Sequence, residues 1–212
     1  MHISEGVLSA PVLLTGAATT VAGVAVGLKT MDNEDIPKTA IVSSALFVAS
    51  LIHIPLGPTS VHLILNGVAG ILLGWQVFPA FLIALFLQAV LFQFGGLTSL
   101  GMNTINVALP AIVGYYLFKS LLKFNRNDKQ LFLGVISFVC GIVPVFLTTI
   151  MLAISLVFTN ESFLEVAQLT IVSHLPVMAI EGIISAFAII FIKRVKPEML
   201  KGVIGKNEEF KI

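Results

Sequence analysis

The first two residues, Met1 and His2, could together hold a transition-metal ion if the terminal amine is free. The amine nitrogen, the backbone nitrogen of His2 and the Nδ1 atom of its imidazole can reach one ion, closing a five-membered and a six-membered chelate ring. A second imidazole would complete a plane of four nitrogens. That arrangement suits Ni²⁺ or Cu²⁺, and low-spin Co²⁺ can follow, whereas Zn²⁺ prefers a tetrahedron.

The segment 51–62 supplies two candidates for that second imidazole, His53 and His62. Two prolines and a glycine interrupt any helix here, and irregular backbone at membrane depth is tolerated only where protein or a cavity covers it. Thr59 or Ser60 is expected to cap the helix that follows, which would place His62 in its first turn and facing the cavity. The alternative interpretation is an ordinary re-entrant turn.

Four more polar residues are candidates for orienting or gating such a site. Asn103 and Asn106 follow a glycine-rich connection and share a helix face, where they could orient an imidazole or cap the helix. Glu181 lies within an apolar stretch, and an acid in that setting is costly and usually functional. His174 lies seven residues earlier on the same face, although a lone histidine can equally be a hydrogen-bonded packing residue.

Membrane helices must position these residues. The chain has 212 residues, of which 57% are hydrophobic and 11% charged, and its mean hydropathy is +1.03; soluble domains are about 45–50% apolar and about 25% charged. The length suits a single transmembrane domain over residues 1–212. The net charge of +1 indicates no nucleic-acid partner. A single cysteine, Cys140, can form neither an internal disulfide nor a thiolate cluster.

The apolar stretches predict an all-α membrane protein of about seven transmembrane helices, since a span needs roughly 20 mostly apolar residues. The predicted spans, of which the second and third are short, are 8–28, 40–54, 61–75, 77–95, 105–122, 130–158 and 169–192.

The basic residues predict the orientation. With the N-terminus outside and the C-terminus cytoplasmic, every Lys and Arg falls on the cytoplasmic side, as the positive-inside rule requires. All four histidines then gather near the outer face. The N-terminus lacks the basic region and cleavage site of a signal peptide, so we expect its first residues to be retained. The basic residues are Lys29, Lys38, Lys119, Lys123, Arg126, Lys129, Lys193, Arg194, Lys196, Lys201, Lys206 and Lys211.

The sequence resembles the substrate-capture subunits of cobalt and nickel energy-coupling-factor transporters, the CbiM/NikM type. The resemblance covers nearly the whole chain. It rests on the start Met1-His2-Ile3 with Glu5-Gly6, the segment from Gly57 through His62 to Gly74, the run Gln93-Phe94-Gly95-Gly96-Leu97-Thr98 with Gly101 and Asn103-Thr104, and the pair Glu181-Gly182.

This resemblance implies capture of Ni²⁺ or Co²⁺ outside a prokaryotic cell, in the multi-pass cell membrane, for ATP-driven uptake. It implies a metal held by the Met1 amine, the His2 amide and imidazole, and His62, with His53 as a lid or relay. It also implies a transmembrane coupling subunit, cytoplasmic ATPase subunits and a small accessory membrane subunit. The chain contains no Gly-x-x-x-x-Gly-Lys-Ser/Thr motif, so it is not expected to be an enzyme, and ATP hydrolysis is expected in the partners.

Two points stay open on the residues alone. The spacing of Gly23 and Gly27 favours close helix packing, either against the coupling subunit or within the chain. The same donors suit Ni²⁺ and Co²⁺, and a capture subunit of this fold for a non-metal solute is the alternative function. An intramembrane metalloprotease is disfavoured because no His-Glu-x-x-His occurs, and a membrane scaffold would not explain the clustered histidines.

Overall fold

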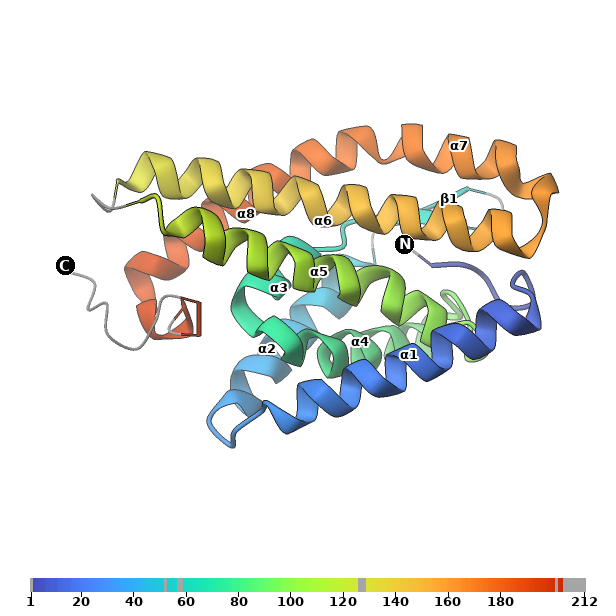
Figure 1. The fold of residues 1–212 in the computed structure, drawn as a ribbon, viewed down its shortest axis with the longest axis horizontal. Helices are drawn as coiled ribbons and strands as arrows, with labels where there is room; N and C mark the ends of the chain where they lie inside the picture. The colour runs from blue at the N-terminus through green and yellow to red at the C-terminus, as the bar shows by residue number, and fades with distance from the viewer. Residues whose placement is uncertain (1, 52, 57–58, 126–128, 201, 204–212) are drawn as a thin grey trace.

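The computed structural model describes residues 2–51, 53–56, 59–125, 129–200 and 202–203. Within these ranges the chain forms a helical bundle with a two-stranded hairpin after its second helix (Figure 1). The helices are α1 (Ala10–Lys29), α2 (Asp35–Ala49), α3 (Asn66–Leu73), α4 (Val77–Phe92), α5 (Leu100–Leu122), α6 (Gln130–Thr159), α7 (Leu164–Ser173) and α8 (Leu175–Val195). Short 3₁₀ turns are η1 (Gly74–Gln76), η2 (Glu161–Phe163) and η3 (Pro197–Leu200).

Five helical segments among the described residues are long and apolar enough to cross a membrane. They are α1, the stretch Asn66–Phe92, α5, α6 and the stretch Glu161–Val195. Large apolar side chains on these segments, such as Leu14 on α1 and Phe187 on α8, are each 71% exposed, as expected for helices that face lipid. The expectation of an all-α membrane protein is therefore confirmed, with the small hairpin as an addition that the sequence did not predict.

The hairpin takes the end of the predicted span 40–54 and the start of the predicted span 61–75. Strand β1 (His53–Leu56) pairs in antiparallel fashion with β2 (Thr59–His62), and the register sets residue 53 opposite residue 62. A short apolar run fits a strand as well as a buried helix, so hydrophobicity alone did not separate the two.

The predicted position of His62 in the first turn of a helix is therefore wrong. α3 begins only at Asn66, after Leu65 in the left-handed conformation (φ 54°), so neither Thr59 nor Ser60 caps it. α3 is about 12 Å long at 1.5 Å per residue, too short to cross a bilayer core of about 30 Å. The chain then turns into α4 through η1, where Gly74 has φ 54°. The predicted span 169–192 is also interrupted, because α7 ends at Ser173 and α8 begins at Leu175.

α3 lies inside the bundle and packs against both α5 and α6. Its glycines allow this position: a Cβ on Gly67 would lie 2.7 Å from the Cα of Gly141 on α6, and one on Gly70 would collide with the backbone of Ala111 on α5. α8 packs along α6, and α1 lies across α4 and α5. The buried α3 thus brings the hairpin and the segment that follows it into the centre of the protein.

Gly23 and Gly27 face the interior of this chain. A Cβ on Gly23 would collide with the ring of Phe78 on α4, and one on Gly27 would lie 2.6 Å from the carbonyl oxygen of Trp75. Both glycines are buried. Of the two alternatives that the spacing left open, the structure places these residues in packing within the chain.

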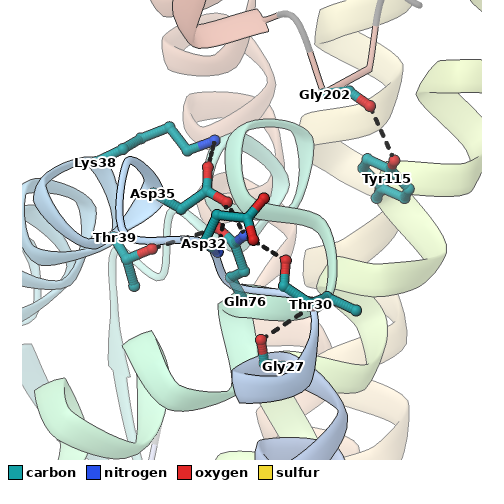
Figure 2. A network of polar contacts seen from close by, with 9 residues as sticks. All are labelled: Gly27, Thr30, Asp32, Asp35, Lys38, Thr39, Gln76, Tyr115 and Gly202. Carbon is teal, nitrogen blue, oxygen red and sulfur yellow. Dashed lines mark hydrogen bonds and ion pairs between the residues drawn. The ribbon is translucent and has the colours of Figure 1, made fainter.

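A polar network fastens η1 to the turn between α1 and α2 (Figure 2). The side-chain amide of Gln76 donates to the carbonyl of Thr30 at 3.2 Å and to the carboxylate of Asp35 at 2.7 Å. Lys38 pairs with the other oxygen of that carboxylate at 3.2 Å, and Thr39 donates to Gln76 at 3.4 Å. The junction of α3 and α4 therefore lies at the end of the bundle where α1 finishes.

Candidate metal centre

The N-terminal segment folds back into the bundle and is held by the start of α5. The N–H of Ile3 donates to Oδ1 of Asn103 at 2.8 Å, and Nδ2 of Asn103 donates to the carbonyl of Ile3 at 3.0 Å. The hydroxyl of Ser99 donates to the same carbonyl at 3.0 Å. Ile3 is fully buried and His2 is 3% exposed. These bonds fix the backbone next to His2, and with it the imidazole.

The glycine-rich loop between α4 and α5 provides further contacts for the same segment. The N–H of Glu5 donates to the carbonyl of Gly95 at 2.9 Å, and the N–H of Thr98 donates to the Glu5 carboxyl at 3.3 Å. Side chains would obstruct this approach: a Cβ on Gly95 would lie 3.2 Å from the Cβ of His2, and one on Gly96 would collide with Glu5. The two glycines therefore leave the space that the N-terminus occupies.

The imidazoles of His2 and His62 are in contact. Their ring centroids lie 4.6 Å apart with 26° between the planes, and Phe94 stacks on His2 at 6.4 Å. His62 is 7% exposed. The ring pair brings together residues from the N-terminal segment and from β2, and Phe94 contributes an apolar wall.

Hydrogen bonding fixes the tautomer of His62. Its Nδ1 lies 2.6 Å from the carbonyl oxygen of Leu63, and a carbonyl can only accept, so Nδ1 carries the proton and Nε2 carries a lone pair. That Nε2 is buried and has no hydrogen-bond partner among the described residues. His62 lies outside the five candidate spans, and burial lowers its pKa to about 4 against the opposing effect of the Leu63 hydrogen bond. A neutral imidazole with a free Nε2 lone pair is the form that binds a metal.

Glu181 on α8 fixes the backbone just after His62. Its carboxyl group accepts hydrogen bonds from the N–H of Ile64 and from the N–H of Leu65, the latter at 2.8 and 3.0 Å. Glu181 is fully buried. It therefore holds the strained residue Leu65 and, through the chain, the position of β2.

His174 lies at the junction of α7 and α8 and is fully buried. Its Nδ1 lies 2.6 Å from the carbonyl oxygen of Thr170, so the same reasoning leaves a lone pair on its Nε2. His174 is close enough to His62 for a charge on one ring to act on the other.

The remaining predicted residues have other partners or lie outside the described part. Asn106 bonds Ser155 on α6, at 3.3 Å, and Ser99, rather than either asparagine, occupies the N-cap position of α5. Met1 and the side chain of His53 lie outside what the structure describes. Sequence reasoning missed Ser99 and Thr170, because a hydrogen bond to a backbone carbonyl leaves no pattern of residue types.

Among the described residues, no group of three His, Cys, Asp or Glu side chains is placed to hold a metal. The geometry offers two touching imidazoles, and His2 also carries a backbone nitrogen as a further donor. Such a donor set favours ions that accept planar nitrogen coordination.

Comparison with known proteins identifies the family. A family described as "Cobalt uptake substrate-specific transmembrane region", CbiM, matches residues 2–199. The chain belongs to the CbiM family. This CbiM protein is accordingly a multi-pass membrane transporter component of the kind found in bacteria and archaea, and it serves as a substrate-specific component for cobalt or nickel uptake.

Individual relatives agree with this assignment. A putative metal transport protein of Haemophilus influenzae is 44% identical over 212 residues, covering 99% of this chain and 100% of the relative. A putative fused nickel transport protein NikMN of Archaeoglobus fulgidus is 31% identical over 76% of this chain, which spans 54% of that protein. A crystal structure of a transition metal transporter superposes with a TM-score of 0.80 at 26% identity, over 95% of this chain and 97% of the other.

Proposed function

We propose that this CbiM protein captures Ni²⁺ or Co²⁺ through the Met1 amine, the backbone nitrogen and imidazole Nδ1 of His2, and Nε2 of His62. The observation that carries the proposal is the contact between the rings of His2 and His62 at 4.6 Å. It supports a single ion that binds both residues, although they are 60 positions apart in the sequence. The proposal requires the amine of Met1 to be free.

The surroundings of the two rings support this donor set. The hydrogen bond to Leu63 leaves the lone pair of His62 on Nε2, and Asn103 and Ser99 hold the backbone beside His2. A deprotonated amide nitrogen is a strong donor that favours ions high in the divalent affinity order, and four nitrogens in a plane suit Ni²⁺. The site is buried, so solvent competes weakly for the ion.

We further propose seven passes with the N-terminus outside, counting α2 and the longer segment that contains α3 as two short passes. Figure 1 supports this orientation, because α1 ends, α2 begins, α5 ends, α6 begins and α8 ends at one end of the bundle. Every basic residue of the described part lies at these helix ends or next to them: Lys29, Lys38, Lys119, Lys123, Lys129, Lys193, Arg194 and Lys196. The positive-inside rule makes that end cytoplasmic and places the His2–His62 pair toward the outside.

The proposed partners are a transmembrane coupling subunit, cytoplasmic ATPase subunits that hydrolyse ATP, and a small accessory membrane subunit. The accessory subunit has direct support from the relatives. The Archaeoglobus protein is named as a fused transport protein, and this chain spans 54% of it.

The decisive experiment compares protein with an authentic N-terminus and protein extended by one residue before Met1. Extension converts the Met1 amine to an amide and removes one donor, while the buried rings stay unchanged. Metal analysis and calorimetric titration with Ni²⁺ and Co²⁺ should show about one tightly held ion per native chain and no tight binding by the extended chain. Equal tight binding by both forms would disprove the N-terminal chelate, and the titration also ranks the two ions.

A further inference from the structure

His62 and His174 have the same hydrogen-bonding arrangement, but the proposed chelate uses only His62. Each ring donates through Nδ1 to a backbone carbonyl at 2.6 Å, His62 to Leu63 and His174 to Thr170. Each therefore carries its lone pair on Nε2. Each Nε2 is buried and without a hydrogen-bond partner among the described residues. A buried acceptor left without a hydrogen bond destabilises the fold, so two such atoms on imidazoles that influence each other electrostatically point to a ligand that they bind.

The fold holds the two rings near each other. Glu181 on α8 bonds the backbone at Leu65, three residues after His62, and His174 precedes Glu181 by seven residues on the same face. Seven residues of helix cover about 10 Å, so His174 lies about two turns before that contact. α7 packs against β2, and the two rings are close enough for a charge on one to act on the other.

We propose that the Nε2 atoms of His62 and His174 form a second holding position for the ion, which it occupies when the N-terminal chelate opens. This inference rests on the proposed capture of Ni²⁺ or Co²⁺ by the N-terminus. His62 belongs to both positions, so the ion exchanges the donors of Met1 and His2 for His174 without leaving the protein. The His2 amide nitrogen regains a proton from water as it lets go.

The donors of the second position determine how strongly it holds the ion. Two neutral imidazoles bind Ni²⁺ and Co²⁺ but provide fewer donors than a chelate that includes a deprotonated amide. The ion is therefore held more weakly there, with water in its other coordination sites. A strong capture site releases its ion slowly, and a weaker neighbouring position that shares a ligand gives the ion a route out of the chelate.

The test uses Ni²⁺ titrations of the full chain extended by one residue before Met1, in which the N-terminal chelate is blocked. We expect weak binding of Ni²⁺ that becomes at least about tenfold weaker, roughly 1.4 kcal/mol, in both His62→Ala and His174→Ala. His174→Gln keeps a side-chain N–H that can donate to Thr170 and should lose the same binding. Ser185→Ala is the matched control, because it removes another buried, unpartnered polar atom from α8. Thermal unfolding confirms that each variant is folded.

The native chain provides the second arm and separates the two proposals. There His62→Ala should remove tight binding, while His174→Ala should leave it within about threefold, or less than 1 kcal/mol. If the native chain binds Ni²⁺ tightly and the extended chain binds none, the chelate stands and the second position is overturned. If His174→Ala leaves the weak binding of the extended chain unchanged, the second position is also overturned. If both chains bind equally and both lose binding with His174→Ala, the chelate fails and the His62–His174 position stands.

Discussion

The backbone N–H of Leu65 donates hydrogen bonds to both carboxyl oxygens of Glu181, with N···O distances of 2.8 and 3.0 Å. Leu65 has a φ of 54°, a conformation that costs a non-glycine residue roughly 1–2 kcal/mol. The acid on α8 thus stabilises a strained residue of another segment, and that residue lies three positions after His62. The intramembrane acid acts here on the backbone that carries a proposed metal ligand.

The first prediction follows from this contact. Glu181→Gln keeps the size of the side chain but replaces one acceptor oxygen with an NH₂ group that faces the donors of Ile64 and Leu65. We expect the protein to fold and its Ni²⁺ affinity to fall by about 10- to 100-fold, as for other groups that orient metal ligands. Calorimetric titration measures the change, with Ser185→Ala, one turn along α8, as the control. Unchanged affinity in a folded Glu181→Gln protein would show that β2 is positioned without this contact.

The second prediction concerns the clamp on the N-terminal segment. Asn103→Ala removes two hydrogen bonds to the backbone of Ile3, each contributing about 1 kcal/mol. We expect Ni²⁺ affinity to fall by roughly tenfold or more, because the backbone next to His2 is no longer held. Asn106→Ala is the matched control: it is the same substitution one turn along α5, at a residue that bonds Ser155 on α6. Equal effects of the two variants on Ni²⁺ affinity would contradict the clamp.

The sequence predicted the membrane class because composition and long apolar stretches are strong signals, and the described helices confirm it. It did not predict the hairpin. The run from His53 to His62 mixes apolar residues with prolines, a glycine and hydroxyl residues, so it has the period of neither a helix nor a strand. Its ends pair through backbone groups, which carry no signal in the residue types. The break between α7 and α8 at His174 was missed for a related reason, since apolar residues continue on both sides of it.

The candidate site was accessible to sequence reasoning only in part. Residue types indicated His2 and either His53 or His62 as metal ligands, the family resemblance favoured His62, and the structure places the rings of His2 and His62 in contact. The contacts of the residues that support these ligands were not predicted. Asn103 was singled out for its place after the glycine-rich connection and Glu181 as an acid in an apolar stretch, but both bond backbone N–H groups rather than an imidazole. Such bonds depend on how segments meet in space, and the spacing of residues along the chain does not encode them.

The third prediction compares two glycines that have the same backbone conformation and different neighbours. Gly95 has a φ of +78° and would place a Cβ 3.0 Å from Nδ2 of Asn103 and 3.2 Å from Cβ of His2. Gly6 has a φ of +77°, and a Cβ there would meet nothing within 4 Å. Alanine at either position brings a similar conformational penalty of about 1 kcal/mol. We expect similar losses of thermal stability but weaker Ni²⁺ binding only in Gly95→Ala; equal binding by both variants would refute the close fit at His2.

The fourth prediction separates the two faces of α1. A Cβ on Gly23 would collide with the ring of Phe78, whereas the neighbouring Ala22 is exposed. Gly23→Ala should therefore destabilise the isolated protein by about 1–3 kcal/mol through overpacking, measured as a lower thermal midpoint in detergent. Ala22→Leu should leave that midpoint unchanged, because its side chain enters lipid or detergent. If Gly23→Ala instead left the isolated protein as stable as before and abolished co-purification with the coupling subunit, the glycine face of α1 would belong to the partner interface.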